Sequence, residues 1–173
     1  MSIVIGIDPG VSGAYAVVST GEIIVADRLP VIKNGKSSRI NGTELAALLR
    51  EYDDASMCWI ERVGAMPGQG VSSTFTFGHS AGVAEGVVSA LCIPVSLVTP
   101  QTWKKRAGLI GTDKDAARSR AIQLYPRQAH LFDKKGLGQA IADAVLIARF
   151  GGRHERCREA PHGQSCRKLL RAV

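Results

Sequence analysis

The apolar positions of this chain fall into short runs that are separated by polar or turn-forming segments. Most of these runs are rich in β-branched side chains and too short for helices, so each predicts a strand: residues 3–7, 14–19, 22–28, 57–60 and 95–98. Thr20 and Gly21 separate the second run from the third and predict a hairpin turn. Residues 3–7 are almost continuously apolar, which is typical of a strand buried on both faces of a sheet.

Segments with helical spacing lie between and after these runs. Residues 44–52 place leucines on one face, with Thr43 as the expected N-cap. Further helices are expected over residues 113–124 and 139–150, and over a segment that begins between Ser72 and Phe77 and ends at Leu91. Residues 30–42 are polar and basic and predict an exposed loop. Three strands followed by alternating helices and strands predict an α/β fold with a mixed sheet.

The helix that ends at Leu91 is rich in small side chains, which would let another element approach it closely: Gly78, Ser80, Ala81, Gly82, Ala84 and Gly86.

The composition indicates one folded domain with a basic surplus. Of the 173 residues, 45% are hydrophobic and 21% charged, and 22 Lys and Arg exceed 15 Asp and Glu, giving a formal net charge of +7. The surplus is concentrated in residues 98–128 and 151–173, which favours a polyanionic partner, most often nucleic acid. We expect one domain over residues 1–150 and a basic tail over residues 151–173.

Several features bear on the cellular compartment. No run approaches the roughly 18 consecutive apolar residues of a membrane span, and the first residues lack the basic segment that opens a signal peptide. The four cysteines are too few for a disulfide framework at this length. The His and Cys residues of the tail match no zinc-finger spacing. We therefore expect a cytoplasmic protein without membrane association.

Three carboxylates stand in apolar surroundings. Asp8 and Glu61 each follow an apolar strand, and Asp143 interrupts the apolar residues 140–148. Taken singly, Asp8 could form a turn before Pro9 and Gly10, and Glu61 could pair with Arg62 at the surface. If the three converge, each pair about 4 Å apart repels by roughly 4 kcal/mol at an effective dielectric constant near 20. A hard divalent cation such as Mg²⁺ or Mn²⁺ would offset this repulsion.

Five segments that contain or adjoin these residues resemble, in order, the motifs of the RuvC family of Holliday-junction resolvases. They are residues 6–10 (GIDPG), 60–63 (IERV), 98–105 (VTPQTWKK), 111–114 (GTDK) and 142–148 (ADAVLIA). The resemblance implies an RNase H-like nuclease domain with a mixed five-stranded sheet of order 3-2-1-4-5, flanked by helices. It also implies a homodimer that cuts four-way DNA junctions. The loop over residues 66–70 most resembles the compact phage or prophage members, which implies a bacterial cell or a phage-infected host.

The same resemblance implies roles for individual residues. Asp8 would bridge two Mg²⁺ ions, Glu61 and Asp143 would each hold one, and a metal-activated water would attack the scissile phosphodiester, leaving 5′-phosphate and 3′-hydroxyl ends. Basic residues of the intervening segments would bind DNA, and Met66 would stand near the junction centre, where some relatives place an aromatic side chain. Phe75 and Phe77 could also reach the junction, but we expect them in the core. The expected DNA-binding residues are Lys104, Lys105, Arg106, Lys114, Arg118 and Met66.

One position departs from the family pattern. The family usually has a fourth metal ligand, an acid or His, about one helical turn before the last Asp, where this chain has Gln139 and Ala140. The carbonyl of Gln139 can coordinate Mg²⁺ without contributing charge. Asp133 could substitute only if its loop folded inward. A weaker second metal site, slow turnover or dependence on Mn²⁺ would follow.

Two alternatives to a junction-resolving nuclease stay open. An RNase H-like nuclease for RNA processing would share the first strand and its Asp. A protein that binds junctions without cutting them would explain Gln139 at the position of a ligand. Sugar-kinase and actin-like ATPases also end a first strand in Asp-x-Gly, but they need more than twice this length.

Overall fold

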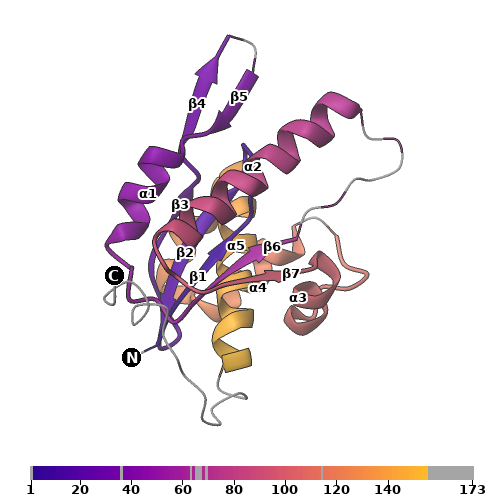
Figure 1. The fold of residues 1–173 in the computed structure, drawn as a ribbon. Helices are drawn as coiled ribbons and strands as arrows, with labels where there is room; N and C mark the ends of the chain where they lie inside the picture. The colour runs from indigo at the N-terminus through magenta and orange to yellow at the C-terminus, as the bar shows by residue number, and fades with distance from the viewer. Residues whose placement is uncertain are drawn as a thin grey trace.

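The computed structural model describes residues 2–35, 37–62, 64, 68, 70–113 and 115–155. They form three layers, with a five-stranded sheet between two layers of helices (Figure 1). The sheet comprises β1 (Ile3–Ile7), β2 (Ala14–Ser19), β3 (Glu22–Arg28), β6 (Met57–Glu61) and β7 (Val95–Val98), and a separate hairpin comprises β4 (Val31–Asn34) and β5 (Ser37–Ile40). The helices are α1 (Gly42–Arg50), α2 (Val71–Ala90), α3 (Pro100–Ala107), α4 (Ala116–Leu124), the 3₁₀ segment η1 (Pro126–Phe132) and α5 (Lys135–Glu155).

β1 lies at the centre of the sheet, whose strand order is β3-β2-β1-β6-β7. It pairs antiparallel with β2 and parallel with β6, and β7 pairs parallel with β6. Because β6 and β7 are the fourth and fifth strands of this sheet along the chain, the predicted order 3-2-1-4-5 is confirmed. The predicted α/β fold with a mixed sheet flanked by helices is confirmed with it.

Helices cover both faces of the sheet, which explains why β1 is apolar almost throughout. Val4 packs in a cluster with α4 and α5, while Ile5 and Ile7 pack on the other face with α1 and α2. Successive strand residues point to opposite faces, so one short run serves both clusters. α5 packs across β1 and β2. A polar side chain on the sheet-facing side of α5 is therefore brought close to the central strands.

α5 approaches β1 very closely at Gly6. A Cβ atom at this position would collide with backbone atoms of Ala144 and Ala148. Gly6 lies two residues before Asp8, and Ala144 directly follows Asp143. The missing side chain at Gly6 thus allows the helix to bring Asp143 to the strand that carries Asp8.

Replacing Gly6 with Ala is expected to lower the free energy of unfolding by about 3 kcal/mol, because backbone atoms of α5 must move apart. Gly152→Ala on the same helix is the matched control. Its Cβ would meet only Val4, at 3.7 Å, and alanine favours a helix interior. Chemical denaturation measures both variants, and equal unfolding free energies would contradict the close packing at Gly6.

The segment expected as an exposed loop over residues 30–42 contains a hairpin instead. β4 and β5 pair antiparallel, with Gly35 in the left-handed region between them at φ 59°. The N-cap of α1 is also different from the prediction: the side chain of Asn41, not Thr43, accepts a hydrogen bond from the backbone N–H of Glu44. The hairpin was missed because the polar residues around Gly35 hide two very short strands. The N-cap prediction was wrong because α1 begins at Gly42, two residues earlier than expected.

Several helices differ from the prediction: α1 covers Gly42–Arg50 instead of residues 44–52, and α4 begins at Ala116 instead of residue 113. α3 was not predicted, although Thr99 at its N-cap, Pro100 in its first turn and Gly108 at its C-cap are ordinary helix signals. α5 begins four residues earlier than expected and continues five residues past residue 150, to Glu155. The first residues assigned to the tail are therefore helical, and residues 156–173 lie outside the described residues.

Phe75 is 73% exposed on α2, whereas we expected it in the core. Phe77 is partly buried. Within the described ranges, none of the helices combines the length and the apolar character that crossing a membrane requires.

Candidate active site

The fold brings the three predicted carboxylates to one edge of the sheet. Asp8 directly follows β1, and Glu61 is the last residue of β6. The two strands are parallel neighbours with Ile7 opposite Ile60, so both carboxylates leave the sheet at the same edge. Asp143 comes from α5, next to the close contact with Gly6. The negative charges of Glu61 and Asp143 both raise the pKa of Asp8, which reflects their proximity.

Asp8 sits in a tight turn whose geometry depends on Gly13. The backbone N–H of Asp8 donates to the carbonyl of Ala14 at 3.0 Å, and that of Gly13 donates to the carbonyl of Gly10 at 2.9 Å. A Cβ atom at Gly13 would collide with the carbonyl oxygen of Asp8. Burial is the main reason why the pKa of Asp8 rises from 3.8 to about 7. The turn therefore holds a carboxyl that is costly to ionise without a cation beside it.

Glu61 is held by a partner that the sequence did not indicate. The indole Nε1 of Trp103 donates a hydrogen bond to Glu61 Oε2 at 2.6 Å, and Trp103 itself is only 1% exposed. Burial raises the pKa of Glu61, while the Trp103 hydrogen bond and the charge of Lys104 lower it. A carboxylate with one oxygen bound in this way keeps the other free to face a ligand. The available signal was a buried Trp, whose N–H needs an acceptor.

Replacing Trp103 with Phe is expected to weaken Mg²⁺ binding about 10- to 100-fold, because Glu61 loses the donor that orients it. Trp59→Phe is the matched control, because Trp59 is also a buried Trp but packs edge-on against Phe150. Calorimetric titration with Mg²⁺ measures both variants. An unchanged metal requirement in Trp103→Phe would contradict this role.

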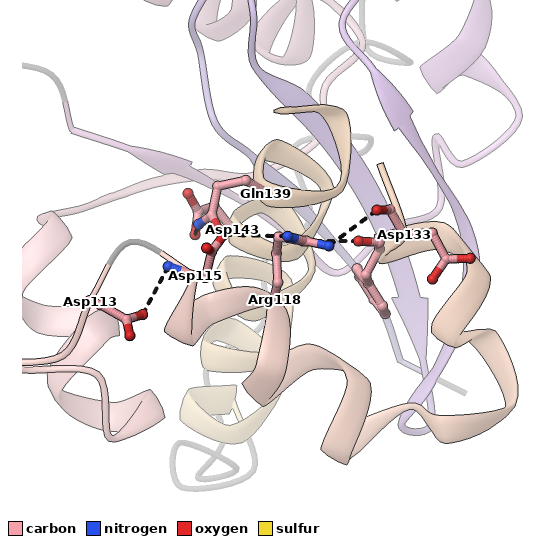
Figure 2. Close-up of polar contacts among 7 residues, drawn as sticks. Asp113, Asp115, Arg118, Asp133, Gln139 and Asp143 are labelled. Carbon is pink, nitrogen blue, oxygen red and sulfur yellow. Dashed lines mark hydrogen bonds and ion pairs between the residues drawn. The ribbon is translucent and has the colours of Figure 1, made fainter. Parts of the chain in front are cut away.

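Asp143 is paired with Gln139 one turn earlier on α5. Gln139 Nε2 donates to Asp143 Oδ1 at 3.1 Å (Figure 2). Burial raises the pKa of Asp143 to about 6, although the Gln139 hydrogen bond and Lys104 lower it. The other end of the amide, Gln139 Oε1, is buried and has no hydrogen-bond donor among the described residues. It is thus an unsatisfied acceptor beside a carboxylate, as a metal or water ligand would be.

The other candidates for a fourth ligand are less well placed. Ala140 is buried in the core. Asp133 is exposed, and its backbone carbonyl accepts a hydrogen bond from Arg118 at 3.1 Å (Figure 2). Gln139 therefore remains the residue that supplies an oxygen next to Asp143.

Lys104 is the cation associated with all three carboxylates. Its charge lowers the pKa of Asp8, of Glu61 and of Asp143. Its ammonium lies 5.3 Å from the centre of the Trp103 ring. Lys104 also lines an open cavity of about 470 Å³ together with Gln139 and Asp143. The site thus has a cation at one wall and room for part of a substrate.

The remaining predicted DNA-binding residues have different environments. Lys105 and Arg106 are exposed on α3. Arg118 instead donates to the carbonyls of Phe132 and Asp133 and to the carboxylate of Asp115, and thereby joins α4 to the segment before α5 (Figure 2). This gives Arg118 a structural role, and its contact with DNA stays a prediction. Lys114 and Met66 lie outside the described residues.

The oxygen donors are of the types that bind a hard divalent cation, but their side chains are not arranged in a complete coordination site. Three carboxylates and an unsatisfied amide oxygen are the ligand types that Mg²⁺ and Mn²⁺ prefer. Among the described residues, no group of three or more His, Cys, Asp and Glu side chains is arranged to hold a metal ion. Glu61 and Asp143 each accept a hydrogen bond from a neighbouring side chain instead.

Comparisons of the whole chain with known proteins bear on this site. No protein-family model matches the chain, and no curated protein resembles it in sequence. RuvC of Thermus thermophilus, in complex with a Holliday junction substrate, superposes with a TM-score of 0.63 over 92% of this chain and 98% of that chain, at 16% identity. The chain has a RuvC-like resolvase fold.

A second resolvase supports the same assignment. The yeast mitochondrial Holliday junction resolvase Ydc2 superposes with a TM-score of 0.60 over 91% of this chain and 82% of that chain, at 18% identity. A second structure of Thermus thermophilus RuvC gives a TM-score of 0.57 at 14% identity. The RuvC-like fold therefore extends over nearly the whole chain, and the resemblance seen in five short motifs is confirmed at the level of fold.

Proposed function

We propose that this protein is a metal-dependent, structure-selective endonuclease that resolves four-way (Holliday) or other branched DNA by paired phosphodiester nicks. The observation that carries the proposal is the convergence of Asp8, Glu61 and Asp143 at one edge of the sheet in a RuvC-like fold. Three partly buried carboxylates in one place are costly for a structural role alone. They suit a site that binds cations and phosphate.

Two Mg²⁺ ions are the proposed cofactors, with Mn²⁺ as a possible substitute. Asp8 is the proposed shared ligand, because both Glu61 and Asp143 raise its pKa. Glu61 would hold one ion with it, and Asp143 and Gln139 would hold the other. When bound, the ions would activate a water molecule and neutralise charge on the scissile phosphate. The raised pKa values and the unsatisfied Gln139 Oε1 support this assignment.

The chain's own residues would prepare this chemistry before any ligand binds. Trp103 orients Glu61 through its indole N–H, and Gln139 orients Asp143 through its amide. Lys104 faces the cavity beside Asp143 and would attract the scissile phosphate as a mobile positive charge. Lys105 and Arg106 extend this positive surface along α3, with Lys114 as a further proposed contact.

Paired nicks require two active sites, and we place a homodimer contact on α2. The exposed side of this helix carries Gly78, Gly82 and Gly86 at four-residue intervals, and a Cβ at any of them would meet no atom within 4 Å. Val71 and Phe75 at the start of the helix are 86% and 73% exposed. A smooth helix face with apolar side chains at one end suits packing against a second copy.

A junction-binding protein without cleavage is the second candidate function. It is favoured by Gln139, which is neutral and donates a hydrogen bond to Asp143 at 3.1 Å, where the related resolvases usually have a charged ligand or His. A site with one fewer negative charge binds the second cation less tightly. Junction cleavage and junction binding alone would use the same DNA-binding surface. They differ in whether the carboxylates bind the metal ions that cleavage needs.

Cleavage of end-labelled DNA separates these functions. A synthetic four-way junction, a linear duplex and an RNA–DNA hybrid would each be incubated with Mg²⁺, with Mn²⁺ or with chelator. We expect paired nicks on opposing strands of the junction alone and no product with chelator. Junction binding without product under either metal would support the second function, and cleavage of the hybrid alone would indicate an RNA-processing nuclease.

A further inference from the structure

We propose that a second phosphate site lies beside the active site, in a pocket between α3, α4 and α5 that is lined by Arg106, Arg120 and Arg149. The ligand class is a tetrahedral phosphate group. Its assignment to a backbone phosphate of branched DNA rests on the proposed function. Arg120 and Arg149 were not among the DNA-binding residues expected from the sequence.

The pocket holds three positive charges without a matching negative one. No Asp or Glu lines it. Arg120 Nη1 donates to the amide oxygen of Gln123 at 3.2 Å, and Arg149 Nη1 donates weakly to the hydroxyl of Tyr125 at 3.5 Å. These acceptors are neutral. Within the described part of the chain, no carboxylate pairs with any of the three arginines, so their mutual repulsion favours an anion between them.

Arg120 has a buried donor that remains unsatisfied. Its Nε is inaccessible to solvent and has no hydrogen-bond acceptor among the described residues. Buried donors are almost always paired, and a donor on a charged group is the most costly to leave unpaired. Arg118 on the same helix shows the contrast, because protein acceptors satisfy its guanidinium. Arg120 therefore keeps unused donor capacity that Arg118 lacks.

The size of the pocket selects the kind of ligand. Its solvent volume of about 20 Å³ holds about one water molecule, and so one phosphate oxygen but no base or sugar. A phosphate on the outside of a DNA strand can insert an oxygen while the rest of the strand stays on the surface. Guanidinium groups recognise such oxygens with paired N–H donors.

Trp103 connects this pocket to the catalytic carboxylates. It lines the pocket and also donates to Glu61 at 2.6 Å. The pocket and the carboxylate site therefore share Trp103 as a common residue. The pocket would hold a DNA segment near the scissile phosphate but outside the reacting group.

Salt-dependent junction binding, measured by fluorescence anisotropy in chelator, tests the pocket in the full chain. We expect Arg120→Gln and Arg149→Gln each to weaken binding about three- to tenfold and to reduce the slope of log K against log salt by about 0.9, the loss of one phosphate contact. Arg50→Gln is the matched control, because Arg50 is exposed on α1, across the sheet from the pocket. Affinities and slopes equal to those of the control would overturn a DNA phosphate in this pocket.

A second measurement does not depend on DNA. Thermal unfolding would be followed in inorganic phosphate and in chloride at equal ionic strength, with Arg120→Lys included as a variant that keeps the charge. Stabilisation by phosphate that is lost in Arg120→Gln, and partly kept in Arg120→Lys, would support the pocket. This result would hold even if the wild-type protein bound no junction. Absence of junction binding by the wild-type protein would reject the proposed function and not the pocket. Weakened junction binding without stabilisation by free phosphate would assign the pocket to DNA alone. Absence of both effects would overturn the proposal.

Discussion

Replacing Asp8 with Asn should abolish junction cleavage, with a loss of at least about a thousandfold, and should leave junction binding intact or tighter. Asp8 is the carboxylate whose pKa both Glu61 and Asp143 raise, so it interacts with both of the other carboxylates. The amide keeps the shape of the side chain but removes the charge that a pair of divalent ions needs. It also removes a negative charge that faces the DNA phosphates, which is why binding is not expected to weaken.

Asp54→Asn is the matched control for this variant. Asp54 is exposed just before β6, at the end of the strand opposite to Glu61, so its loss changes the net charge equally without touching the site. Cleavage on denaturing gels and binding by gel shift would be measured for both variants. Cleavage retained by Asp8→Asn would show that the active site lies elsewhere. Binding lost in Asp8→Asn but kept in Asp54→Asn would mean that Asp8 holds the fold of the DNA-binding surface.

Much of the architecture was predictable because it depends on local patterns. The five strands of the main sheet are short apolar runs, and burial on both faces makes such runs stand out. The three carboxylates stood out for the related reason that a charge inside an apolar run needs an explanation. Their arrangement at one edge of the sheet then follows from the parallel pairing of β1 with β6.

The errors arose where local pattern is weak or where tertiary packing decides. The β4–β5 hairpin consists of four-residue strands among polar residues, so its alternation is too short to stand out. Phe75 is apolar, and apolar residues are expected in cores, but it lies on a part of α2 that this chain leaves exposed. Only the arrangement of the helices on the sheet shows which side of α2 is free.

The partners of the functional residues could not be predicted, because they are far apart in the sequence. Glu61 and Trp103 are 42 residues apart and meet only after α3 docks beside the end of the sheet. Arg118 and Arg120 are two residues apart in one basic segment, yet one is bound by protein acceptors and the other lines an open pocket. Charge density in the sequence therefore indicates a DNA-binding region without showing which cations are free to bind.

The carboxylate cluster should also make the metal-free protein less stable as the pH rises. Burial, together with the neighbouring carboxylates, raises the pKa of Asp8 from 3.8 to about 7, and burial raises the pKa of Asp143 from 3.8 to about 6. A carboxyl with a raised folded-state pKa binds its proton more tightly in the folded state. Its stabilising contribution is complete below the unfolded-state pKa and is lost as the pH rises through the folded-state pKa. We therefore expect the free energy of unfolding to fall between about pH 4 and pH 7.5.

The size of this fall can be bounded from Asp8. One pKa unit corresponds to about 1.4 kcal/mol, so the difference between 3.8 and about 7 corresponds to about 4 kcal/mol. Asp8 retains some solvent access, which screens its neighbours, so we expect about 2 to 3 kcal/mol from this residue. Asp8→Asn should then be more stable than the wild-type protein at pH 8 by this amount and close to it at pH 4.5.

Chemical denaturation in chelator at several pH values measures how the free energy of unfolding changes with pH. The same series with Mg²⁺ separates the contribution of the three carboxylates from that of the other titrating groups of the protein. A cation bound by the carboxylates would favour their ionised forms, so Mg²⁺ should stabilise the wild-type protein at pH 8 and have little effect on Asp8→Asn. Asp54→Asn removes an exposed carboxyl outside the site and is the control for the loss of one charge. A flat stability profile in chelator would mean that neither burial nor mutual repulsion makes these carboxyls costly to ionise in the folded protein. Without that cost, the main physical reason for placing cations among them would be lost.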